Sequence, residues 1–197
     1  MNKWQGPGIP DQAFLRVDGI PMTKQEIRAI SLSKMRLFPG AVIYDIGAGS
    51  GSVAIECKLL VPEAEVYAVE REARAVQLIH RNSERFGVDI HVIEGLAPAC
   101  LVSLPPADRI FLGGSGGYIA EILSSCDRLL QENGRIVINA VSLHTLEEAR
   151  RFFTAKNYCC EIIQVQIAVH QFKGDAEFWQ ARNPITIISA EKQGVRR

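Results

Sequence analysis

Short apolar runs alternate with helical patterns along most of this chain, and that alternation constrains the fold more than any other feature. The apolar runs predict five strands, at residues 41–46, 65–69, 90–93, 109–112 and 135–141. The helical patterns lie at about 23–37, 52–61, 72–86, 118–130 and 143–156. A helix between successive strands makes those strands parallel and places helices on both faces of the sheet. We therefore predict a doubly wound α/β domain.

The two ends of the chain depart from this alternation. Residues 1–22 are rich in Gly and Pro, and we predict that they form an irregular N-terminal extension to a single domain over residues 23–197. Thr23 followed by Glu26 has the form of a capping box, which predicts that Thr23 caps the first helix. Near the other end, 161–169 and 185–188 are strand-like with no helical pattern between them. They predict an antiparallel pair at one edge of the sheet.

Composition disfavours several classes of function. The 22 Lys and Arg balance 22 Asp and Glu, which argues against a nucleic-acid binder that relies on a general basic field. No apolar run reaches the ~18–20 residues of a membrane span, and the first residues do not begin a signal peptide. The five cysteines include no Cys-x-x-Cys pair, and the four histidines lack metal-ligand spacing. We expect a cytoplasmic protein without membrane, nucleic-acid or metal partners.

A glycine-rich turn, Gly47-Ala48-Gly49-Ser50-Gly51, follows the first predicted strand. Such a strand–turn–helix unit directs backbone N–H groups and a helix N-terminus at a ligand. Asp45, just before the turn, would repel a pyrophosphate but suits a positive amine. Glu70, at the end of the second strand, can accept both hydroxyls of a ribose. Ser52 stands where a dinucleotide fingerprint prefers Gly or Ala, so an NAD site fits less well than one for a nucleoside with a zwitterionic tail.

A second glycine-rich segment, Gly113–Gly117, follows the fourth strand, at the sheet edge where open α/β folds bind ligands. It lacks the Asn-Pro-Pro-Tyr type of motif used to methylate amide or exocyclic nitrogens. It also lacks the paired acids that hold a catalytic cation. Its glycines leave open space, which suits a broad, flat substrate.

Asp45, the first glycine turn and Glu70 together resemble the class I methyltransferases, which use S-adenosylmethionine. The resemblance implies a Rossmann-like, seven-stranded, mostly parallel sheet that ends in an antiparallel hairpin. It also implies a set of cofactor-binding residues at the methionine, ribose and adenine ends of the ligand: Asp45, Gly47, Ala48, Gly49, Ser50, Gly51, Glu70, Leu96 and Ala97.

Five segments carry a closer resemblance: 20–28, 45–51, 113–117, 134–140 and 182–184. Together they resemble the decarboxylating precorrin methyltransferases of cobalamin biosynthesis, over about residues 19–190. This implies methylation of a tetrapyrrole at C15, with loss of carbon dioxide from the C12 acetate of cobalt-precorrin-6B or precorrin-6Y. It also implies a homotetramer, and places Thr23 and Gly113 at the cofactor. A separate precorrin methyltransferase that adds the C5 methyl group is a candidate functional partner.

The implied substrate is a polycarboxylate and the chain is neutral, so local cations must surround the site. Lys24 and Arg28, on one face of the first helix, and Arg182 are the candidates, with Ser115 and Asn139 as neutral contacts. No catalytic acid or base is assigned, because a sulfonium is already an activated methyl donor. Two alternatives remain open: a methyltransferase acting on RNA or protein, and an NAD-dependent reductase or nucleotide-binding module.

Overall fold

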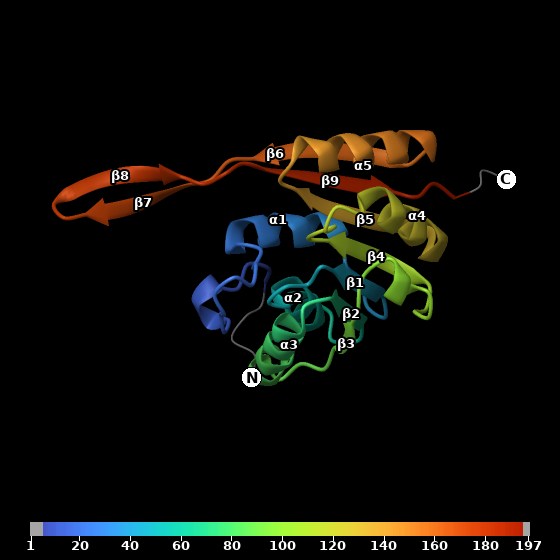
Figure 1. The fold of residues 1–197 in the computed structure, drawn as a ribbon, viewed down its shortest axis with the longest axis horizontal. Helices are drawn as coiled ribbons and strands as arrows, with labels where there is room; N and C mark the ends of the chain where they lie inside the picture. The colour runs from blue at the N-terminus through green and yellow to red at the C-terminus, as the bar shows by residue number, and fades with distance from the viewer. Residues whose placement is uncertain (1–5, 195–197) are drawn as a thin grey trace.

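A seven-stranded sheet with the order β3-β2-β1-β4-β5-β9-β6 forms the centre of the computed structural model, which describes residues 6–194 (Figure 1). The parallel strands are β1 (Val42–Ile46), β2 (Glu65–Glu70), β3 (His91–Glu94), β4 (Ala107–Leu112) and β5 (Leu130–Ala140). The last two strands, β6 (Cys159–Val165) and β9 (Ile185–Glu191), are antiparallel to their neighbours. The predicted doubly wound fold is confirmed. The first five residues of the predicted extension and the last three of the predicted domain lie outside the described residues.

Helices cover both faces of this sheet and divide the core in two (Figure 1). One face carries α1 (Gln25–Met35), α2 (Ser52–Leu60) and α3 (Ala73–Phe86), and the other carries α4 (Ile119–Leu129) and α5 (Leu143–Ala155). The central strand β1 is buried on both sides, as its unbroken apolar run predicts. No helix within residues 6–194 is long and apolar enough to cross a membrane.

The segment before α1 packs onto the domain. A short 3₁₀ helix spans Asp11–Ala13, and the buried side chains of Ile9 and Phe14 join the hydrophobic core beneath α1 and α2. The predicted capping box is wrong. Helix α1 begins at Gln25, the N-cap residue of the helix is Lys24, and neither Thr23 nor Lys24 caps the helix through its side chain. Instead, the Gln25 N–H donates to Asp11 Oδ1 at 2.9 Å. Asp11, from the packed N-terminal segment, thus takes the capping role that was predicted for Thr23.

A second, two-stranded sheet projects from the body of the molecule (Figure 1). Its strands β7 (Ala168–Lys173) and β8 (Ala176–Ala181) pair as a hairpin. The strand predicted over 161–169 is therefore divided, because β6 leaves the main sheet at Val165. Alternation of buried and exposed residues cannot signal a ribbon whose two faces are almost entirely exposed.

Candidate cofactor and substrate pocket

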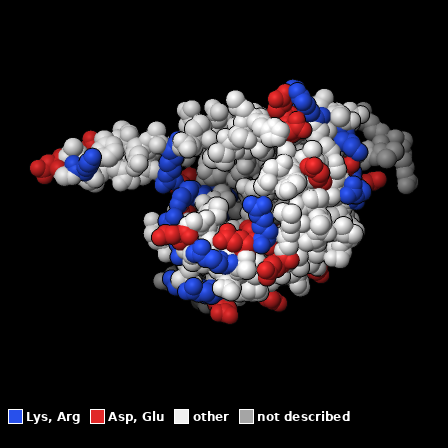
Figure 2. Space-filling view, viewed as in Figure 1, with Lys and Arg blue, Asp and Glu red and all other residues white. Residues whose placement is uncertain are grey.

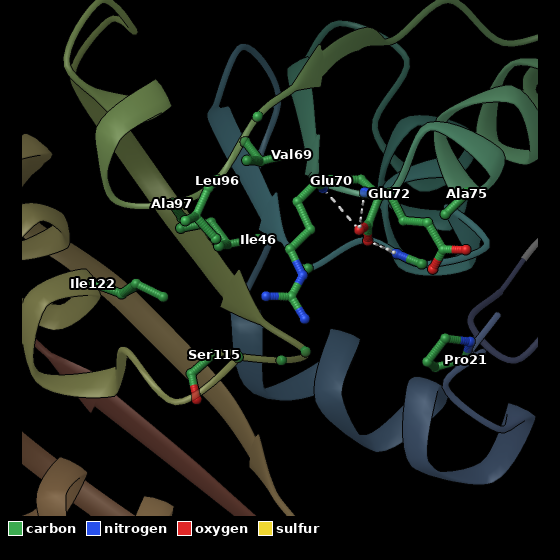
Figure 3. Close-up of a pocket in the computed structure, with 17 residues that line it drawn as sticks. Pro21, Ile46, Val69, Glu70, Glu72, Ala75, Leu96, Ala97, Ser115 and Ile122 are labelled. Atoms are coloured by element: carbon green, nitrogen blue, oxygen red, sulfur yellow. Dashed lines mark hydrogen bonds between the residues drawn. The ribbon is translucent and has the colours of Figure 1, made fainter. Parts of the chain in front are cut away.

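The carboxyl ends of β1, β2, β3 and β4 meet at one edge of the sheet, and a pocket opens there (Figure 3). It encloses about 800 Å³, a volume that includes the part open to solvent. Its walls come from the turns that follow these four strands, with contributions from α3, α4 and the segment before α1. The lining residues are Pro21, Ile46, Gly47, Gly49, Val69, Glu70, Arg71, Glu72, Ala75, Gly95, Leu96, Ala97, Gly113, Gly114, Ser115, Gly116 and Ile122.

The turn after β1 needs glycine because other backbone segments press against it. A Cβ on Gly47 would lie 2.7 Å from the Gly114 carbonyl oxygen, and one on Gly49 would lie 2.5 Å from the Pro21 carbonyl oxygen. Both glycines also have positive φ, +71° and +54°. The turn can thus close against the loop after β4 and against the segment that leads into α1. The resulting pocket wall is mainly backbone.

Glu70 ends β2 and points its carboxylate at this turn (Figure 3). Oε2 accepts from the Gly49 N–H at 2.8 Å, and Oε1 accepts from the N–H groups of Arg71 and Glu72 at 2.8 and 3.0 Å. A carboxylate offers about four lone-pair sites, so these three amides leave room for one further donor. A ribose diol that uses both oxygens must displace at least one amide.

The Asp45 carboxyl does not line the pocket. It is buried beneath the turn, where Oδ2 accepts from the Ala54 N–H at 3.0 Å and Oδ1 has no partner among the described residues. Burial raises the pKa of Asp45 to about 7; the Ala54 hydrogen bond lowers it and the charge of Glu70 raises it further. The prediction that Asp45 meets a ligand amine directly is therefore not supported by its position. Ala48, Ser50 and Gly51 also lie outside the pocket lining.

The loops after β3 and β4 supply the remaining walls. Leu96, 45% exposed, and Ala97 line the pocket with apolar surface, and their contact with an adenine ring stays a prediction. Gly113 and Ser115 line the opposite side, also at predicted positions. Sequence reasoning missed Arg71. Its position directly after Glu70, at the carboxyl end of a parallel strand, was the signal that could have found it.

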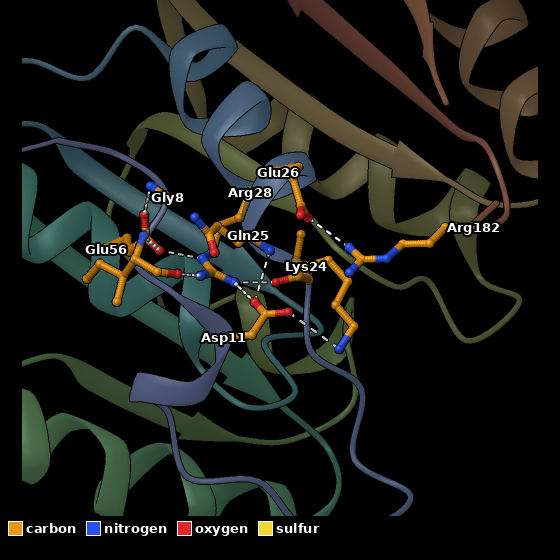
Figure 4. A network of polar contacts seen from close by, with 10 residues as sticks. Gly8, Asp11, Lys24, Gln25, Glu26, Arg28, Glu56 and Arg182 are labelled. Carbon is orange, nitrogen blue, oxygen red and sulfur yellow. Dashed lines mark hydrogen bonds and ion pairs between the residues drawn. The ribbon is translucent and has the colours of Figure 1, made fainter. Parts of the chain in front are cut away.

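Arg28 was predicted to face the substrate, and the structure contradicts this (Figure 4). Its side chain is fully buried and forms an ion pair with the equally buried Glu56 through Nε. Nη1 donates to Asp11 Oδ1 at 3.3 Å and to the Thr23 carbonyl, and Nη2 donates to the Ile9 carbonyl. Arg28 thus fastens the N-terminal segment to α1 and α2. Four of its five N–H donors are used within the protein, and its complete burial keeps it from a substrate.

Four other predicted residues, Thr23, Lys24, Asn139 and Arg182, lie outside the pocket lining. Lys24 Nζ lies 3.5 Å from Asp11 Oδ2, and Arg182 Nη1 lies 2.8 Å from an oxygen of Glu26 on α1 (Figure 4). Asn139 Oδ1 accepts from the Ser31 hydroxyl at 2.9 Å. Across residues 6–194, no group of three or more His, Cys, Asp or Glu is placed to hold a metal ion.

Comparison with known proteins places these features in a family. A model described as the precorrin methyltransferase domain matches residues 13–192. A protein of Sulfurisphaera tokodaii, named a probable cobalt-precorrin-6B C(15)-methyltransferase (decarboxylating), is 43% identical over 94% of this chain and 98% of its own length.

Solved structures agree with the sequence comparison. The precorrin-6Y C5,15-methyltransferase of Geobacter metallireducens is 40% identical, with a TM-score of 0.88 over 94% of this chain and 97% of that one. A SAM-dependent O-methyltransferase of Thermotoga maritima is only 15% identical but reaches a TM-score of 0.73, which shows a shared fold. The fold is that of the class I methyltransferases.

Proposed function

This chain belongs to the precorrin methyltransferase family, and we propose that it methylates C15 of cobalt-precorrin-6B, or of the corresponding cobalt-free precorrin, and removes the carboxyl of the C12 acetate as carbon dioxide. The observation that carries the proposal is that residues predicted to bind the cofactor line a single pocket. Glu70, the apolar pair Leu96–Ala97 and the two glycine turns line one cavity at the carboxyl edge of the sheet. The family match covers every one of these residues.

We propose S-adenosylmethionine as the methyl donor, and the residues present fit it. The anchored carboxylate of Glu70 would accept a ribose hydroxyl, and Leu96 and Ala97 would pack against the adenine. The backbone of Gly47 and Gly49 would lie along the methionine end. When bound, S-adenosylmethionine supplies an activated methyl group on a sulfonium.

The contribution of the chain to the reaction is then mainly alignment. The loop after β4 offers glycines and Ser115, and the ionisable side chains that line the pocket belong to Glu70, Arg71 and Glu72. With so few acid–base groups at hand, the pocket must hold the ring carbon in line with the methyl group and exclude water. The conjugated macrocycle accepts the electrons released when the acetate loses its carboxyl.

We also propose that the protein assembles as a homotetramer and that a separate enzyme adds the C5 methyl group. The exposed hairpin supports self-association: Phe172 is 67% exposed and Trp179 is 72% exposed. Figure 2 shows that the hairpin is largely uncharged along its length, with charged side chains at its tip and near its base. Large exposed aromatic side chains of this kind are typical of interaction surfaces.

Turnover with two labels tests the proposed reaction. The protein is incubated with methyl-labelled S-adenosylmethionine and with cobalt-precorrin-6B labelled in the carboxyl of the C12 acetate. We expect equal amounts of methyl incorporation and released carbon dioxide. Methyl uptake by RNA or protein in place of the tetrapyrrole, or no uptake by any acceptor, would refute the proposal.

A further inference from the structure

We propose that Arg71 binds a carboxylate of the substrate at the mouth of the pocket and so selects for a polycarboxylate ring. The inference rests on the proposed function and assigns one specificity-determining residue within it. Three observations support it: the Arg71 side chain lines the pocket, its guanidinium extends to the loop after β4, and it has no ionic partner among the described residues.

The Arg71 side chain spans the pocket from one wall to the other. Its backbone N–H donates to Glu70 Oε1 at 2.8 Å, which fixes the main chain at the end of β2. Its guanidinium reaches the loop after β4, where a Cβ built on Gly116 would lie 3.0 Å from Nη1 and 3.5 Å from Cζ. The positive charge therefore lies between the turn that carries Glu70 and the loop that would face the substrate.

Arg71 keeps its donors available for a ligand. Its side chain is exposed, and it takes part in no ion pair and no side-chain hydrogen bond with any other residue between 6 and 194. Two acids, Glu70 and Glu72, line the same pocket, but neither forms an ion pair with Arg71. The Glu70 carboxylate is instead held by three backbone amides. A planar guanidinium with free donors is suited to a carboxylate.

The cations predicted from sequence cannot take this role as they stand. Arg28 is buried against Glu56, and Lys24 and Arg182 are paired with Asp11 and Glu26 outside the pocket lining. Arg71 is the one basic residue among the described residues that line the pocket. A substrate with several carboxylates that enters this pocket therefore meets Arg71.

The test measures ligand binding by calorimetry for the wild type and three variants. Arg71→Gln removes the charge, Arg71→Lys keeps the charge without the planar fork, and Arg74→Gln removes a neighbouring exposed charge on α3 that lies outside the pocket lining. The ligands are cobalt-precorrin-6B, with S-adenosylhomocysteine present, and S-adenosylhomocysteine alone.

We expect Arg71→Gln to weaken cobalt-precorrin-6B binding roughly tenfold or more, the size of a lost charge-assisted hydrogen bond. Arg71→Lys should fall between it and the wild type, and Arg74→Gln should bind as the wild type does. S-adenosylhomocysteine affinity should stay the same in all four proteins. Added salt should weaken tetrapyrrole binding to the wild type more than to Arg71→Gln.

Two results would overturn the assignment, and a third concerns the proposed function instead. Unchanged tetrapyrrole affinity in Arg71→Gln contradicts a substrate role. Loss of S-adenosylhomocysteine affinity in that variant, with tetrapyrrole affinity intact, assigns Arg71 to the cofactor. If the wild type binds S-adenosylhomocysteine but no cobalt-precorrin-6B, the proposed substrate is wrong, and the inference about Arg71 falls with it.

Discussion

The Glu70 carboxylate holds together three backbone amides and stands at the wall of the pocket, so it links the local fold of the β1 and β2 turns to ligand binding. We expect Glu70→Ala to weaken S-adenosylhomocysteine binding at least tenfold, because a charge-assisted hydrogen bond contributes about 1.5–3 kcal/mol. Glu94→Ala is the matched control, since Glu94 pairs with Glu70 in register on β3 but does not line the pocket. Calorimetry that finds equal affinity in the two variants contradicts the assignment.

The buried Arg28 carries a prediction about stability rather than substrate binding. Arg28→Ala leaves Glu56 without its cation and should lower the free energy of unfolding by about 3–5 kcal/mol. Lys34 lies on the same helix and forms a more exposed ion pair with Glu161 on β6. Lys34→Ala should therefore lower the free energy of unfolding by about 1 kcal/mol or less. Urea unfolding measures both. Wild-type stability in Arg28→Ala would argue against the buried network.

Asp45 should make stability depend on pH. Between its ordinary pKa of 3.8 and about 7, the folded protein keeps a proton on Asp45 that the unfolded chain has released. Its contribution to stability therefore falls as the pH rises through this window, with a slope approaching about 1.4 kcal/mol per pH unit. Asp45→Asn, a neutral side chain of the same shape, should remove that part of the slope. Urea unfolding across the window would contradict the prediction if both proteins gave the same slope.

At the scale of elements, the two glycine turns and the segment before α1 depend on close contact with one another. Gly49→Ala should be much more destabilising than Gly87→Ala. Both positions have positive φ, but a Cβ at Gly49 meets the Pro21 carbonyl whereas one at Gly87 meets nothing within 4 Å. Gly87→Ala is therefore the control, and it should lose only the free energy of the backbone strain, about 1–2 kcal/mol. Thermal unfolding compares the variants, and equal losses would mean that the contact with Pro21 is unimportant.

The elements that the sequence predicts well are those whose burial is periodic. The alternation of apolar runs and helical patterns gave the parallel strands and the antiparallel edge, and Glu70 and Leu96 fell in the pocket as expected. The errors come from long-range contacts. Arg28 looks like a surface cation until Glu56, far along the chain, is packed against it, and Asp11 replaces Thr23 as the cap for the same reason.

At the scale of the whole molecule, the β7–β8 hairpin is the part that the isolated chain leaves unexplained. It projects from the body of the molecule (Figure 1), and its aromatic side chains are exposed to solvent. If the hairpin joins subunits, Trp179→Glu should shift the protein from a tetramer to smaller species, because burying an unpaired charge in an interface is costly. Tyr118→Glu, on the body of the molecule, replaces another exposed aromatic residue and is the control. Sedimentation that finds a monomeric wild type refutes the tetramer, and a tetrameric Trp179→Glu refutes the role of the hairpin.

The claim on which the other conclusions depend is that the pocket at the carboxyl edge of the sheet holds the methyl donor. A crystal structure of the protein with S-adenosylhomocysteine tests it most directly. We expect a ribose hydroxyl on the Glu70 carboxylate, the adenine against Leu96 and Ala97, and the amino-acid end along Gly47 and Gly49. A ligand bound at any other place, or a ribose that makes no contact with Glu70, would contradict the account.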